Sequence, residues 1–185
     1  GTARASHVDF EGRLTAADFS DMTDHSTHVA GTIGGAGIAD ASYRGMAPGV
    51  SLLSYGFEFS NSQVILYTNP GDIEFDYDEA INIHGADIAN NSIGSNIESN
   101  LFECEIQGDY GITSSLIDSI VIGSLGSPFR VVWAAGNERP ENRCDIEGFG
   151  AYYSMAPPAG AKNHICVGAV NSNNDSMTTF SSWGP

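Results

Sequence analysis

Two histidines near the start of the chain are the residues best suited to acid–base chemistry. His25 and His28 lie in the stretch His-Ser-Thr-His-Val-Ala-Gly-Thr-Ile, and residues 25–36 are predicted to form a helix of small residues. A histidine in the first turn lies at the positive end of the helix dipole, which favours the neutral imidazole that a general base needs. Spacing alone leaves three interpretations open for His25: a general base, a metal pair with His28, or an ordinary histidine at a helix start. No acidic third ligand has the spacing of a zinc-protease helix motif.

Asn137 is the second candidate. It follows the apolar run 130–135 and is reached through Gly136. An amide at a strand end can point into a cleft and donate a hydrogen bond to a developing oxyanion. The alternative is a turn-forming asparagine, which is common where a strand ends.

The three cysteines predict one disulfide. Cys104 and Cys144 lie in polar stretches that contain glycine, whereas Cys166 lies in the apolar run 165–167. The simplest pairing joins Cys104 to Cys144 and leaves Cys166 as a buried, small hydrophobic residue. Three free thiols are the alternative. The cysteines and histidines do not have zinc-ligand spacing, so no metal site is predicted from them.

Apolar spacing predicts an alternation of strands and helices around these residues. A helix is expected from Asp72 to Gly85, with Ile73, Tyr77, Ala80, Ile81 and His84 on one face, and a second from Ile112 to near Gly123. The expected strands are residues 50–57, 87–93, 130–135 and 165–170.

This alternation indicates a three-layer α/β fold, a mostly parallel sheet with helices on both faces. Residues 1–185 are expected to form a single, truncated domain. In such folds the site lies at the carboxyl ends of the strands, where this chain places residues 92–94 and 134–137.

Composition narrows the class of function. The chain has 23 acidic and 7 basic residues and a formal net charge of −16. Like charge disfavours a nucleic acid or an anionic membrane as partner, and no apolar run approaches the ~20 residues of a membrane helix. This balance fits a secreted or salt-tolerant protein. No glycine-rich phosphate loop follows a predicted strand, which argues against a nucleotide-binding domain.

Five blocks, in order along nearly the whole chain, resemble those of the subtilisin-like serine proteases (subtilases). They are the His-Ser-Thr-His-Val-Ala-Gly-Thr stretch at 25–32, Gly-Met-Ala-Pro at 45–48, Asn-Ser-Ile-Gly at 91–94, Ala-Ala-Gly-Asn at 134–137, and Val-Gly-Ala at 167–169 with Phe-Ser-Ser-Trp-Gly-Pro at 180–185.

The resemblance implies a role for each of these positions. His25 would be the general base of a Ser-His-Asp triad, and Asn137 would donate to the oxyanion. The backbones of Ser92, Ile93 and Gly94 and of Ala134, Ala135 and Gly136 would line the specificity pocket and pair with an extended peptide. The implied partner is a peptide or protein substrate, and the implied location is extracellular.

The same comparison predicts that two triad members lie outside these residues. Residues 6–10, Ser-His-Val-Asp-Phe, resemble the stretch that follows the catalytic aspartate, which would therefore precede Gly1. The serine belongs to a Gly-Thr-Ser-Met-Ala block that this sequence does not contain. Asp21 and Asp24 are interpreted as cap or surface acids, and Ser181 and Ser182 as strand or loop serines.

The fragment alone is accordingly expected to be inactive, because no acyl-enzyme forms without the nucleophile. The alternative function is a degenerate, non-catalytic subtilase domain that binds peptides or a protein partner. Ser26 stands where the family has glycine, and the helix start is expected to tolerate it.

No cofactor is required by the implied reaction. The acidic stretches 72–79 and 103–109 are candidates for a structural calcium ion, although the first also fits the solvated face of a helix.

Overall fold

The computed structural model describes residues 1–18, 20–56, 59–60, 63–64, 70–98, 100–139, 143–144, 148 and 150–184. These residues fall into two compact units, Gly1–Ile65 and Leu66–Pro185, and each unit is described by itself.

The first unit is built on a parallel strand pair joined by a helix. Strand β1 (Leu14–Ala16) pairs with β2 (Leu52–Ser54), and helix α1 (Asp24–Gly34) lies between them in the sequence. The predicted helix at 25–36 is confirmed with slightly different ends. The predicted strand at 50–57 is shorter, and residue 57 lies outside the described residues.

The side chain of Arg13 holds the loops of this unit together. The Arg13 guanidinium donates to the carbonyl oxygens of Gly34 (3.0 Å) and Val50 (2.8 Å), at the end of α1 and before β2. The core consists of Ala3, Phe10, Leu14 and Ala30, with Ala5 and Leu52 packed against it. The unit also contains 3₁₀ turns at Val8–Phe10 and Ala41–Tyr43, and the antiparallel pair β3 (Phe59–Ser60) and β4 (Gln63–Val64).

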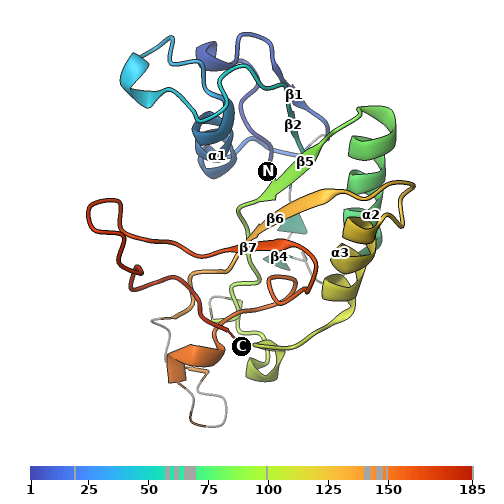
Figure 1. Cartoon of the computed structure of the whole chain (residues 1–185), viewed down its shortest axis with the longest axis vertical. Helices are drawn as coiled ribbons and strands as arrows, with labels where there is room; N and C mark the ends of the chain where they lie inside the picture. Colours follow the sequence, from blue (N-terminus) through green and yellow to red (C-terminus); the bar gives the residue numbers. More distant parts are fainter. Residues whose placement is uncertain are drawn as a thin grey trace. The chain divides into compact units, whose positions relative to one another are not determined.

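The second unit contains a parallel three-stranded sheet in the order β5-β6-β7. These strands are Ile88–Asn91, Arg130–Ala134 and Ile165–Val167, each within a predicted strand. Asn91 lies opposite Trp133, and Ala134 lies opposite Val167. The carboxyl ends of the strands therefore meet at one edge (Figure 1).

Helices α2 (Pro70–Asp78) and α3 (Ile112–Ile122) pack beside this sheet (Figure 1). They bury the face that carries Ala89, Val131 and Trp133. Helix α2 begins at Pro70 rather than at the predicted Asp72, and it continues as a π-helical turn, Glu79–Ile83. Helix α3 has the predicted bounds and ends at Gly123, whose φ of 106° suits glycine. Within the described residues no helix is long and apolar enough to cross a membrane.

Cys166 differs from its prediction. It is exposed rather than buried, because β7 lies at the edge of the described three-stranded sheet. Its neighbours Ile165 and Val167 are about half exposed, at 56% and 48%. An apolar run in the sequence therefore marks a strand here, not a buried position.

Candidate functional site

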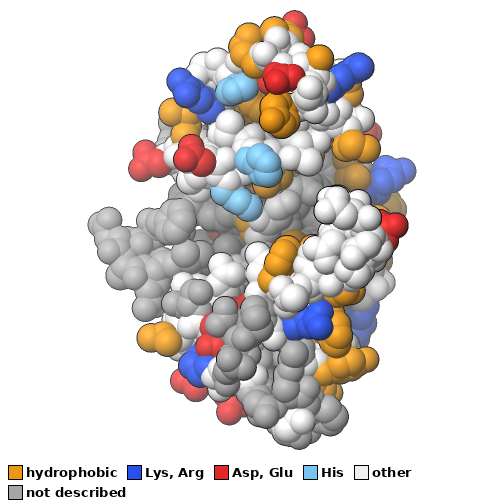
Figure 2. All heavy atoms as spheres, turned by 90° about the vertical axis from the view of Figure 1, so that its left-hand side faces the viewer, with side chains coloured by type: hydrophobic (Ala, Val, Ile, Leu, Met, Phe, Trp, Pro, Cys, Tyr) orange, Lys and Arg blue, Asp and Glu red, His pale blue; other side chains and the backbone are white. Residues whose placement is uncertain are grey.

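His25 occupies the first turn of α1, as the sequence predicts. Thr23 caps this helix: its side-chain oxygen accepts a hydrogen bond from the Ser26 amide (3.2 Å). The cap is therefore Thr23 and neither Asp21 nor Asp24, both of which are exposed surface acids. His25 and His28 are exposed as well, and histidine side chains are visible on the surface in Figure 2.

Ser26 fits the helix start without strain. It lies within α1 and is not among the described residues with positive φ. Its hydroxyl accepts from Thr23 Oγ1 (2.8 Å) and donates to the carbonyl oxygen of Gly1 (2.6 Å). A serine at this position thus adds contacts that a glycine lacks.

The first residues of the chain lie beside this helix start. The Thr2 amide donates to the Asp21 carbonyl oxygen, and the Thr23 amide donates to the Thr2 carbonyl oxygen, both over 2.9 Å. The Arg4 amide donates to Thr27 Oγ1 on α1 (3.0 Å). The backbone of Gly1 is therefore held next to the turn that carries His25.

In the second unit, the segments that follow β5 and β6 line a small, partly open pocket. Four of the predicted substrate-binding residues line it: Gly94, Ala134, Ala135 and Gly136. Ser92 and Ile93 are not among its lining residues. Instead, Ser92 Oγ accepts from Asn90 Nδ2 (2.9 Å), and the Ile93 carbonyl oxygen accepts from the Trp133 indole (3.0 Å).

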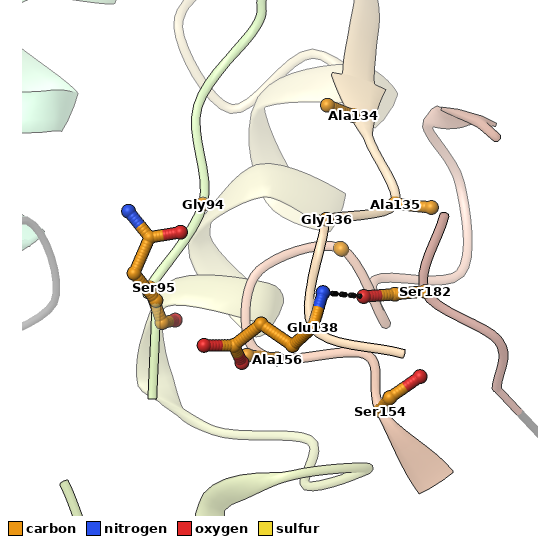
Figure 3. Close-up of a pocket in the computed structure, with 11 residues that line it drawn as sticks. Gly94, Ser95, Ala134, Ala135, Gly136, Glu138, Ser154, Ala156 and Ser182 are labelled. Carbon is orange, nitrogen blue, oxygen red and sulfur yellow. Dashed lines mark hydrogen bonds between the residues drawn. The ribbon is translucent and has the colours of Figure 1, made fainter. Parts of the chain in front are cut away.

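Buried polar side chains complete the pocket, and the sequence did not predict them. Ser95, Glu138, Ser154 and Ser182 line it and are at least 93% buried. The Glu138 side chain points toward the segment at Gly94 and Ser95, and its amide donates to Ser182 Oγ (Figure 3). The available signals were that Glu138 directly follows Asn137 and that Ser182 lies in the block at 180–185.

Gly136 makes the close packing at the end of β6 feasible. Its φ is +108°, and a Cβ added there would lie 2.9 Å from Ser182 Oγ. The Ser182 amide donates to the Gly136 carbonyl oxygen (2.9 Å). A larger residue would be strained and would push Ser182 out of the pocket wall.

Asn137 is exposed and is not a pocket-lining residue. It follows Ala135, which is buried, and Gly136, which is half-buried, and both of these residues line the pocket. Ser181 is a structural residue as expected: it is buried, and its hydroxyl accepts from the Ala169 amide (3.0 Å). His25 belongs to the first unit and Asn137 to the second.

The predicted disulfide between Cys104 and Cys144 is present. Arg143, next to it, forms an ion pair with Glu98 through Nε and Oε2 (3.2 Å). Among the residues that the structure describes, no group of three or more histidine, cysteine or acidic side chains is arranged to hold a metal ion.

Comparison with known proteins decides the family. The model of the subtilase family, peptidase S8, matches residues 4–185. The chain belongs to the subtilase family. This subtilase chain is 32% identical over 185 residues to Subtilisin-like protease 2 of Pseudogymnoascus destructans, covering 96% of the chain and 37% of that protein. It is 31% identical over 186 residues to Alkaline serine exoprotease A of Vibrio alginolyticus, covering 96% of the chain and 28% of that protein.

Solved structures agree with the fold. The chain matches a structure titled "S41 Psychrophilic Protease" with a TM-score of 0.65 at 20% identity, covering 99% of the chain and 56% of that chain. It matches "Sphericase" with a TM-score of 0.61, also at 20% identity. The predicted three-layer, mostly parallel α/β fold is thereby confirmed.

The subtilase chain spans 28–37% of the length of these two curated relatives. The family confirms the resemblance that the five sequence blocks indicated. The roles of His25, Asn137 and the pocket residues stay predictions.

Proposed function

We propose that these residues are part of a serine endopeptidase that hydrolyses peptide bonds through a Ser-His-Asp triad. His25 is its general base: it accepts the proton of the serine nucleophile and returns it to the leaving amine. The observation that supports this best is the family match over residues 4–185, together with an exposed His25 in the first turn of α1. We further propose that residues 1–185 are one truncated peptidase domain.

Asn137 is the proposed oxyanion donor. Its exposed side chain follows Gly136 at the end of β6, beside the pocket. An amide held there by a rigid strand end donates a hydrogen bond to the oxygen that becomes negative in the tetrahedral intermediate. Removing such a donor costs about 100- to 1,000-fold in kcat.

The pocket is the proposed site for a substrate side chain. Gly94 and Ala134 to Gly136 bring backbone and small side chains to its wall. Ser92 and Ile93, which precede Gly94 and do not line the pocket, are proposed to contact the extended substrate backbone. Backbone pairing of this kind tolerates many peptide sequences.

The aspartate and serine of the triad are proposed to lie outside residues 1–185, so that this chain alone does not hydrolyse peptides. Support for the position of the aspartate comes from Gly1, whose carbonyl oxygen accepts from Ser26, the residue after His25. A residue directly before Gly1 would therefore lie close to the helix turn that carries His25. Without the nucleophile, no acyl-enzyme forms.

The parent protein is proposed to be secreted. The Cys104–Cys144 disulfide and a net charge of −16 support an extracellular location. The proposed substrates are peptides or proteins, and the triad reaction requires no cofactor.

Casein hydrolysis tests the function. The 185-residue chain and the longest natural chain that contains it are assayed side by side. We expect hydrolysis only by the longer chain, together with labelling of one serine by a fluorophosphonate. Peptide binding by the longer chain without labelling or hydrolysis would refute the peptidase and favour the non-catalytic binding domain. Hydrolysis by the 185 residues that His25→Ala abolishes would refute the inactivity of the fragment.

A further inference from the structure

Glu98 lies between the disulfide and the pocket. Its side chain is 12% exposed, and its carboxylate faces residues 143 and 144. Oε1 accepts from the Cys144 amide (3.0 Å), and Oε2 accepts from Arg143 Nε (3.2 Å). Both carboxylate oxygens are thus bound to the segment that carries one end of the disulfide.

The backbone of Glu98 reaches the pocket. Its amide donates to Oε1 of Glu138 over 3.0 Å. Glu138 lines the pocket and is 93% buried. A continuous series of hydrogen bonds therefore runs from Cys144 through Glu98 to a pocket side chain.

Arg143 fixes the segment on both sides of Glu98. Its Nη2 donates to the carbonyl oxygens of Ile97 (2.9 Å) and Phe102 (2.6 Å). Cys104 follows two residues after Phe102 and is joined to Cys144. The disulfide and the guanidinium together hold Ile97, Phe102 and Cys104 against residues 143–144.

We propose that Glu98 is a positioning residue for the pocket: it transmits the constraint of the Cys104–Cys144 disulfide to Glu138 and so sets how tightly a substrate side chain is held. The assignment of a substrate to the pocket rests on the proposed function, whereas the coupling of disulfide to pocket does not.

The chemistry explains why Glu98 is suited to this role. A carboxylate can accept from an amide and a guanidinium at the same time, and charge-assisted bonds are stronger than neutral ones. Reduction of the disulfide frees residue 144 to move away, and Glu98 Oε1 then loses the Cys144 amide that donates to it. Glu98 then loses one of the two contacts that orient its backbone amide toward Glu138.

Hydrogen exchange of single amides tests the coupling in the 185-residue chain. All forms carry Cys166→Ser, so that a reductant acts only on the disulfide. We expect the Glu98 and Glu138 amides to exchange about tenfold faster after reduction or in Glu98→Ala, while amides of α3 and β6 stay within about twofold. Glu98→Gln, which keeps an oxygen for the Cys144 amide, is expected to lie between Glu98→Ala and the parent.

Glu103→Gln is the matched control, because it removes an exposed carboxylate next to Cys104. It is expected to leave both amides unchanged. The coupling is refuted if the Glu98 and Glu138 amides keep their exchange rates after reduction of the disulfide. It is also refuted if the amides of α3 and β6 accelerate by the same factor, since that result means a general loss of stability.

Kinetics of the longer chain add an independent readout. With chromogenic peptides that differ only in the residue before the cleaved bond, Glu98→Ala should raise KM about tenfold and change kcat less than twofold. Equal KM values in Glu98→Ala and Glu103→Gln would refute the role in substrate binding. If exchange shows the coupling but no form of the protein cleaves peptides, the proposed function fails and the coupling stands.

Discussion

The Glu138 amide donates a hydrogen bond to Ser182 Oγ (3.0 Å), and the Ser182 amide donates one to the Gly136 carbonyl oxygen (2.9 Å). These two bonds join the segment after β6 to a segment more than forty residues later in the sequence. The pocket wall is therefore formed by segments distant in sequence, and its stability depends on the side chain of Ser182, a residue that is 4% exposed.

Ser182→Ala should destabilise the protein. The substitution leaves the buried Glu138 amide without its acceptor, and such a loss costs about 1–3 kcal/mol in the free energy of unfolding. Denaturant unfolding measures the change. Ser172→Ala, at an exposed serine of the same unit, is the control and should stay within about 0.5 kcal/mol of the parent. Equal stability of the two variants would show that the Ser182 contact contributes nothing.

Ser26→Gly should lower stability and leave catalysis nearly intact. The variant loses the hydroxyl contacts to Gly1 and Thr23 and places glycine in a helix, for a total of about 1–2 kcal/mol. His25 keeps its position because Thr23 still caps α1 through the residue-26 amide. Ser26→Ala removes the same hydroxyl without placing a glycine in the helix, so it measures the stability lost with the hydroxyl contacts alone. A large rise in peptidase activity of the longer chain in Ser26→Gly would contradict this account.

Local pattern was sufficient to predict most of the regular elements. Gly123 marks the end of α3 because glycine adopts positive φ, and the small residues around His25 mark α1. The run 130–135 became β6 almost unchanged. Strand β1, with three residues, was missed because so short a segment shows no alternation.

The pocket could be predicted only in part. Gly94 and Ala134 to Gly136 were predicted because they lie in the sequence blocks that resemble the family. Ser154 lies outside these blocks, and only the folded structure shows that it lines the pocket. Cys166 was predicted to be buried, but it is exposed because β7 is an edge strand of the described sheet. Whether a strand residue is covered depends on neighbours distant in sequence, which periodicity does not reveal.

Asp118 should control the ionisation of Tyr110. The Tyr110 hydroxyl donates to Asp118 Oδ2 (2.7 Å), and this bond raises the pKa of Tyr110, because ionisation would place two negative groups together. The contribution to stability is complete below the ordinary tyrosine pKa of ~10 and is lost as the pH rises through the raised folded-state value. Tyrosinate absorbance, with the Tyr110→Phe curve subtracted, should show a lower Tyr110 pKa in Asp118→Asn. An identical titration in both proteins would contradict this.

Melting curves test the calcium candidates in the acidic stretches 72–79 and 103–109. If either stretch binds calcium, excess calcium should raise the melting temperature by several degrees over that in EDTA, since an ion that binds only the folded state shifts the equilibrium toward it. Melting curves that agree within about 1 °C would contradict a structural calcium ion.

The most direct test of the proposed peptidase is the rate of chromogenic peptide hydrolysis by the longest natural chain, with and without His25→Ala. We expect a loss of about a millionfold in kcat/KM for His25→Ala, because the serine then has no base. His28→Ala, three residues further along the exposed face of α1, should retain activity within about threefold of the parent. Full activity in His25→Ala would contradict the assignment of the general base.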